Sequence, residues 1–184
     1  MLLPNRSNVN LTNADLRRSD LTNANLEFAD LSNTKLSDSK LCKANLSNAN
    51  LQECDLSNAA INQANLSHAN LADAILSNAN LSNANLRHAN LKNAVLSNAI
   101  LSNADLSDSN LEDTILSDAI LSNANLNGAV LTGSQLVSAK LDAAFLIGTN
   151  LVKANLRLAN LNGVSLSEAN LFGTIMPDGS VHNH

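Results

Sequence analysis

The sequence predicts an all-β solenoid in which the chain winds as a four-sided coil. Three observations predict it: a leucine returns every five residues, a small residue stands two positions before it, and departures from this pattern recur every 20 residues. The recurring leucines, called centres below, run in unbroken register from Leu11 to Leu171 with only Ile61 different, and Met176 continues the series. One unit, Ala-Asn-Leu-Ser-Asn, therefore accounts for almost the whole chain.

A helix does not explain this unit. Five residues rotate an α-helix by a net angle of about 140°, so the leucines would spread around the helix instead of forming a stripe. Asn and Ser in every unit also oppose helix formation. In an extended segment, a small residue and a leucine two positions apart face the same side, and the two following polar residues suit a turn. Each unit is thus predicted to be a very short strand followed by a corner.

The number of sides follows from substitutions outside the centres. A recurrence every 20 residues means that four units complete one turn of the coil, because stacked positions share their surroundings. Residues 9–176 then form about 8 coils, and strand spacing gives a rod about 40 Å long. The recurrences are Ile75 with Val95 and Ile115, Ile100 with Ile120, and His68 with His88.

The unit resembles the repeat of the pentapeptide-repeat proteins, Ala-Asp/Asn-Leu-x-x, and the resemblance covers about residues 9–176. It implies a right-handed quadrilateral β-helix, with the leucine and the small residue inside and the other three positions outside. Phe is common at the centre in that family and is absent from it here. The core is therefore expected to be unusually uniform.

The two ends lie outside the repeat. Residues 1–8 form a short lead-in in which Leu2 and Leu3 could fold over the first coil, and residues 177–184 read as a turn and tail. No capping helix is evident at either end. Short loops that suffice as caps, a module cut from a longer protein, and two rods meeting end to end all fit this pattern.

Composition favours a cytoplasmic, non-catalytic protein. The chain has no signal-peptide pattern and no apolar run long enough to span a membrane. Cys42 is predicted to point outward and Cys54 inward, so a disulfide between them is not expected. No nucleophile motif, phosphate-binding loop or carboxylate pair indicates catalysis, and no cofactor is expected. Net charge is −5 with scattered Lys and Arg, so nucleic-acid binding is not expected either.

Apolar residues at outward positions form the candidate interaction surface. Contiguous exposed apolar surface usually marks a contact with another protein or a second copy. The other interpretation is that β-branched residues favour the ladder through cross-strand packing. The candidate residues are Ile75, Val95, Ile100, Ile115, Ile120, Val130 and Phe145.

Two further columns on the predicted surface carry titratable side chains. His68, His88 and Asp108 share one predicted column, where imidazole and carboxylate ligands suit a divalent metal, but exposed polar ladder residues explain them equally well and no metal site is assigned. Glu53, Asp73 and Asp113 share another column. The resemblance implies that acidic surfaces in this family can imitate duplex DNA and inhibit DNA gyrase.

The sequence favours a non-catalytic scaffold that binds an unidentified protein partner or a second copy. Two alternatives remain at this point: a DNA-mimicking inhibitor of DNA gyrase or another topoisomerase, and the repeat domain of a larger protein. The apolar residues favour the scaffold, since a mimic of DNA needs a dense array of negative charges.

Overall fold

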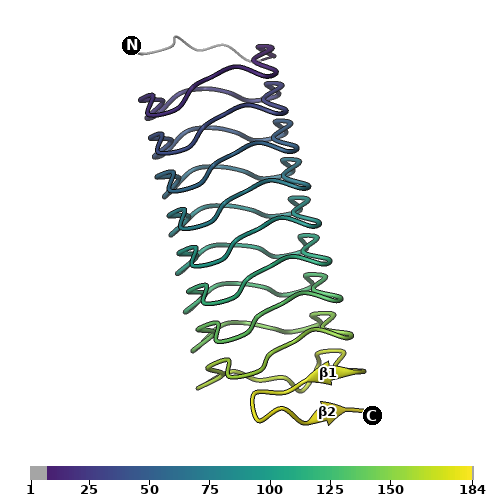
Figure 1. Cartoon of the computed structure of the whole chain (residues 1–184). Helices are drawn as coiled ribbons and strands as arrows, with labels where there is room; N and C mark the ends of the chain where they lie inside the picture. Colours follow the sequence, from purple (N-terminus) through teal and green to yellow (C-terminus); the bar gives the residue numbers. More distant parts are fainter. Residues whose placement is uncertain (1–7, 184) are drawn as a thin grey trace.

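The computed structural model describes residues 8–183. The predicted contacts of Leu2 and Leu3 lie outside this range. Figure 1 shows the chain wound into stacked coils along one rod, with the first described coil (purple) at one end and the hairpin of β1 and β2 (yellow) at the other. Parallel bridges join residues 20 apart from Asn10↔Asp30 to Asn155↔Ile175, so four five-residue units complete each coil. The predicted all-β quadrilateral coil is confirmed.

The backbone of each unit bonds to the next coil in a fixed way. The amide of Leu76 donates to the carbonyl oxygen of Val95 (2.7 Å), and the amide of Asn78 donates to that of Ser97 (3.0 Å). The corner closes where the amide of Ala79 donates to the carbonyl of Leu76 (3.0 Å). Strand and corner therefore alternate within five residues, as the sequence predicts.

The two positions of the repeat unit that most often hold Asn have different structural roles. The second residue after the centre has a positive φ, for example 60° at Asn78, and Asn tolerates this left-handed conformation better than most residues. The residue before the centre accepts from the corner, as when the amide of Ser82 donates to Asn80 Oδ1 (3.0 Å). It also bonds along its column, where Asn85 Nδ2 donates to Asn65 Oδ1 (3.1 Å). Asn is thus favoured at two positions for different physical reasons.

Leucine and alanine fill the interior of the rod. From Leu21 to Leu156 the centres are almost fully buried, and so are most of the small residues. Where Thr replaces Ala its hydroxyl needs an acceptor, and Thr114 Oγ1 donates to the carbonyl of Leu111 (2.8 Å). Cys54 is buried at a small position, and burial raises the pKa of its thiol to about 12. Cys42 is half-buried, and both cysteines are free thiols.

Ser39 gives a test of this interior. Its Oγ is buried and has no hydrogen-bond partner, so Ser39→Ala should raise the free energy of unfolding by about 1 kcal/mol, since a buried unsatisfied hydroxyl is removed. Ser109→Ala is the matched control, because Ser109 Oγ donates to the carbonyl of Leu106 (2.6 Å). Urea denaturation should show a gain for the first variant and none for the second. Equal changes in the free energy of unfolding for the two variants would contradict the assignment of Ser39 Oγ as a buried hydroxyl without a partner.

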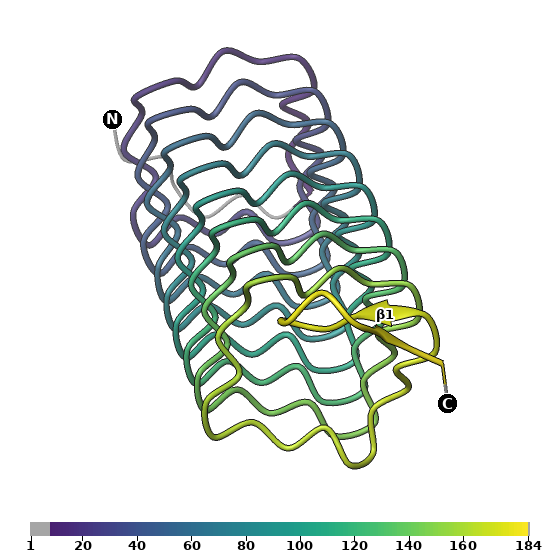
Figure 2. The ribbon, with the colours of Figure 1, turned by 60° about the horizontal axis from the view of Figure 1, so that its bottom comes forward.

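The C-terminal residues form a hairpin at the end of the rod. β1 (Thr174–Ile175) pairs antiparallel with β2 (Val181–His182), with Thr174 opposite His182 and Ile175 opposite Val181. Figure 2 shows the hairpin crossing the end of the four-sided coil. The stretch expected as a turn and tail is therefore partly paired in a sheet. The turn at 178–180 explains this pairing, since the amide of Ser180 donates to Asp178 Oδ1 (2.9 Å) and Gly179 adopts a φ of 86°.

One face of the last coil lacks the regular ladder. Three bonds found on every earlier coil are missing between residues 144–148 and 164–168: Leu146 N–H to Ser165 O, Gly148 N–H to Ser167 O, and Ser165 N–H to Ala144 O. The ladder is present just before it, at Ala143 N–H to Asn162 O (2.8 Å), and resumes at Asn170 N–H to Thr149 O (2.9 Å). We call this side of the rod the open face.

No helix in residues 8–183 is long and apolar enough to cross a membrane.

Candidate interaction surface

Two neighbouring faces carry stacked apolar side chains. On one face Ile75 bridges to Val95, which bridges to Ile115, and on the next face Ile100 bridges to Ile120. One corner, residues 97–98, separates Val95 from Ile100 within a coil. Ile75, Ile115 and Ile100 are 45%, 39% and 37% exposed, and the other two are half-buried. We call these five residues the apolar columns.

Polar and charged residues border the apolar columns at both ends. Asp55 bridges to Ile75 at the N-terminal side. At the C-terminal side Gln135 follows Ile115 and Lys140 follows Ile120 in the same ladders. An apolar centre with a polar rim is the usual organisation of a protein interface. The two faces therefore each carry a short apolar column, with a polar corner such as Ser97-Asn98 between them.

Val130 and Phe145 lie on two other faces of the rod, away from the apolar columns. Val130 stands between Asn110 and Asn150 in the ladder of a third face, and Phe145 bridges to Asn125 on the fourth. The structure therefore separates them from the apolar columns. The 20-residue recurrence placed the other five residues in columns but assigned no face to Val130 or Phe145. Phe145, which is 54% exposed, lines a cavity of about 350 Å³ at the open face. Sequence reasoning missed this cavity.

The histidine column forms a stacked pair. The rings of His68 and His88 have centroids 4.8 Å apart and planes inclined by 20°. Asp108 follows in the same column, and its Oδ1 lies over Gly128, only 2.5 Å from where a Cβ would stand. Within residues 8–183, no three His, Cys, Asp or Glu side chains come together as a metal site. The column is a ladder of exposed polar groups in which Gly128 makes room for a carboxylate.

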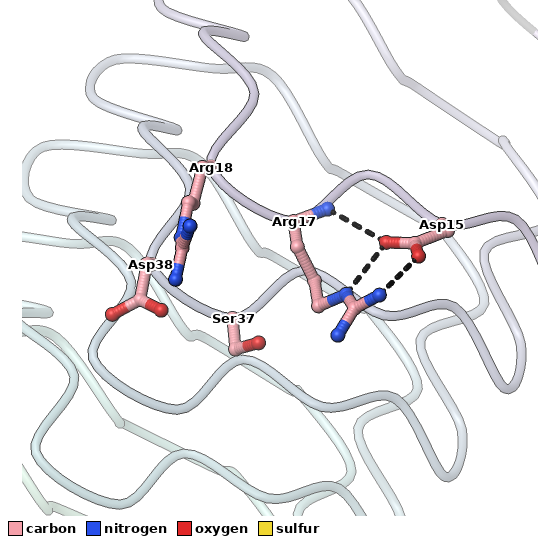
Figure 3. Close-up of a pocket in the computed structure, with 5 residues that line it drawn as sticks. All are labelled: Asp15, Arg17, Arg18, Ser37 and Asp38. Atoms are coloured by element: carbon pink, nitrogen blue, oxygen red, sulfur yellow. Dashed lines mark hydrogen bonds and ion pairs between the residues drawn. The ribbon is translucent and has the colours of Figure 1, made fainter.

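A polar hollow near the N-terminal end was also not foreseen. Asp15, Arg17, Arg18, Ser37 and Asp38 line a volume of about 430 Å³, drawn in Figure 3. Arg17 donates from Nε to Asp15 Oδ1 (2.8 Å) and from Nη2 to Asp15 Oδ2 (2.6 Å), and these bonds hold the pKa of Asp15 at about 2. Both side chains are about half exposed. The hollow is therefore an open surface feature occupied by its own ion pair.

Carboxylates elsewhere on the rod are interspersed with neutral and basic partners. Asn93 Nδ2 donates to Asp73 Oδ1 (2.9 Å) within the column that holds Glu53 and Asp113. On the same side of the rod Lys92 Nζ pairs with Glu112 Oε2 (2.8 Å). The acidic column is therefore broken by an amide and lies beside an ion pair. It does not resemble the closely spaced phosphates of DNA.

Comparison with known proteins identifies the family of this chain. The family model described as "Pentapeptide repeats (8 copies)" matches overlapping segments that together span residues 7–176. The chain belongs to the pentapeptide repeat family. Its members form right-handed quadrilateral β-helices, so the expected handedness is confirmed together with the fold. A search of curated proteins finds no match.

Among solved structures, the chain is similar to HetL from the cyanobacterium Nostoc sp. strain PCC 7120, a pentapeptide repeat protein involved in heterocyst differentiation regulation. The two are 35% identical over 97% of this chain and 93% of HetL, with a TM-score of 0.52. Rfr23 from Cyanothece 51142 is 40% identical over 55% of this chain and 63% of its own, with a TM-score of 0.43. QnrB1, a plasmid-mediated fluoroquinolone resistance protein, is 17% identical over 95% and 94%, with a TM-score of 0.46.

Proposed function

We propose that this pentapeptide repeat protein is a non-catalytic scaffold that contacts another protein through the apolar columns. The observation that carries the proposal is the alignment of five apolar side chains on two adjacent faces of a surface otherwise made mostly of Asn and Ser. Cross-coil hydrogen bonds hold the backbone beneath them in place. A rigid surface loses little conformational entropy on binding, so even a small apolar area contributes to affinity.

The size of the apolar columns suggests a transient contact. Burying the exposed remainder of each side chain contributes about 1 kcal/mol, and the five together about 5 kcal/mol. Association costs at least about 4 kcal/mol in lost translational and rotational freedom. The polar rim must therefore add hydrogen bonds before binding becomes tight. We expect a weak interface centred on Ile100 and Ile115 instead of a large obligate one.

The likeness to HetL supports a scaffold. HetL is described as involved in regulation, and a regulatory protein of this fold needs a binding surface and no catalytic cleft. The likeness to QnrB1 shows the fold alone, and the broken acidic column gives no support to gyrase inhibition. We place the protein in the cytoplasm, where its two free thiols would stay reduced.

Light scattering tests whether the partner is a second copy. We expect the wild-type mass to rise with concentration and the double variant Ile100→Asp, Ile115→Asp to stay monomeric, because two carboxylates would be buried in the contact. Phe28→Asp is the matched control, since Phe28 is exposed on a distant coil and Asp tolerates its φ of 57°. Equal masses for the wild type and the double variant would rule out self-association through the apolar columns.

A stability measurement separates a contact surface from ladder packing. Asn is the usual residue at these positions and forms ladder bonds of its own, such as Asn85 to Asn65. If the apolar columns serve binding, Val95→Asn with Ile115→Asn should leave the melting temperature within about 3 °C of the wild type. A fall of about 10 °C would instead assign these residues to cross-strand packing and count against the proposal.

A further inference from the structure

Asn is followed by Gly at two corners of the rod, Asn127-Gly128 and Asn162-Gly163. Asn is chemically labile, and it is most labile before Gly, because glycine has no Cβ to hinder attack by its own amide nitrogen on the preceding side chain. Both pairs follow a centre leucine, but they lie on different coils. Their surroundings in the folded chain therefore decide how fast each of them reacts.

Hydrogen bonds to the next coil hold Asn127 and Gly128 in place. The amide of Gly128 donates to the carbonyl oxygen of Ile147 (2.9 Å), and Asn127 Oδ1 accepts from the amide of Ile147 (2.8 Å). Asn127 is also half-buried. Both groups that would react, the Gly128 nitrogen and the Asn127 side-chain amide, are engaged in bonds that must break before the groups can meet.

The same two groups of Asn162 and Gly163 have no hydrogen-bond partner among residues 8–183. The coil ladder would bring residue 182 to the amide of Gly163, but the carbonyl oxygen of His182 accepts from the amide of Gly173 in the hairpin instead (2.7 Å). Asn162 and Gly163 are both exposed. The Asn162 side chain and the Gly163 nitrogen can therefore meet after a smaller local opening than Asn127 and Gly128 require.

We propose that Asn162 is a site of spontaneous deamidation and that the new carboxylate loosens the last coil. The Gly163 nitrogen loses its proton to water and attacks Asn162 Cγ, so that a C–N bond closes a succinimide ring and the side-chain nitrogen leaves as ammonia. Water then opens the ring at either carbonyl. One product is aspartate. The other is isoaspartate, in which the main chain runs through the side-chain carboxyl group and gains an extra carbon atom.

The new charge would lie next to Asp142, which stands one coil before Asn162 in the same corner column. Side chains in this column reach from coil to coil, since Cys42 Sγ donates to Asn62 Oδ1 (3.0 Å) and Ser122 Oγ donates to Asp142 Oδ1 (2.8 Å). Deamidation replaces an amide beside a carboxylate with two carboxylates that repel each other. The residues that follow already lack ladder bonds on the open face, so we expect this coil to detach first.

Peptide mapping of the full chain by mass spectrometry tests the proposal. The protein is stored in neutral buffer and sampled over time, and trypsin separates the two sites because Lys140 and Lys153 lie between them. Electron-transfer fragmentation distinguishes aspartate from isoaspartate. We expect Asn162 to lose its amide at least about tenfold faster than Asn127 in the folded chain. In concentrated urea, where both coils are unfolded, the two sites should react at similar rates.

Gly163→Ala is the matched control for the reaction. A Cβ on Gly163 would meet no atom closer than 3.9 Å, and Ala143 adopts the same left-handed conformation one coil earlier, with a φ of 55°. The variant should therefore fold as the wild type does. The added methyl group hinders attack by the nitrogen, so Asn162 should lose its amide much more slowly than in the wild type.

A variant that carries the product tests the structural consequence. Asn162→Asp should speed hydrogen exchange at the amide of Ala143, which donates to the carbonyl oxygen of residue 162 (2.8 Å), and adding Asp142→Asn should restore the slower exchange. The proposal would be overturned by loss of amide at Asn162 no faster than at Asn127, by a difference that persists in urea, by an unchanged rate in Gly163→Ala, or by unchanged exchange in Asn162→Asp.

Discussion

The variant Ala84→Phe is expected to lose about 3 kcal/mol or more of unfolding free energy. Ala84 is almost fully buried between coils whose interior is filled by leucines. A phenyl ring at this position cannot be accommodated without moving the stacked backbone, because a well-packed core resists added volume. Urea denaturation and the melting temperature measure the loss. An unchanged melting temperature would contradict the inward assignment of the small residue.

Asn85→Phe is the control for this prediction. Asn85 is the next residue along the chain and points outward in the column where Phe145 already stands exposed. The change removes the ladder bond from Asn85 to Asn65 and should cost only about 1 kcal/mol. The pair therefore compares the same aromatic side chain on the two sides of one strand.

Leu101→Ala is expected to cost about 2–5 kcal/mol, because it leaves a cavity between coils that cannot collapse around it. Leu101 is fully buried in the middle of the rod. The same change at Leu161, which is only half-buried in the last coil, should cost about 1 kcal/mol. Denaturant titrations of the two variants give this comparison. Equal losses would mean that the last coil is packed as tightly as the middle.

Much of the fold could be predicted from sequence because every coil repeats the same local physics. The five-residue spacing is enough to tell which residues point inward, and the 20-residue recurrence is enough to place Ile75 over Val95 and Ile100 over Ile120. The left-handed corners are visible only in the folded chain. They explain why Asn is common two positions after the centre, and they also accept Phe28 and Leu158.

The ends of the rod could not be predicted in the same way. The pairing of β2 with β1 depends on how residues 176–180 turn, and no repeat specifies that turn. The open face lies between two coils and includes Phe145, which the sequence singled out, together with Val164 and Ser165, which it did not. The hollow at Asp15 and Arg17 likewise required knowing which side chains meet across a corner. A residue that departs from the repeat consensus becomes informative only when its neighbours in space are known.

The near-equivalence of the four faces has a genetic consequence. Loss or gain of five codons leaves every leucine inside, but it turns all later coils by a quarter turn relative to the earlier ones. Loss or gain of 20 codons restores the alignment and changes only the length of the rod, by about 4.8 Å. Replication slippage can therefore rearrange the surface of this protein without damaging its interior. The alignment of Ile75, Val95 and Ile115 is a feature that such slippage would destroy, and so one that selection for binding could preserve.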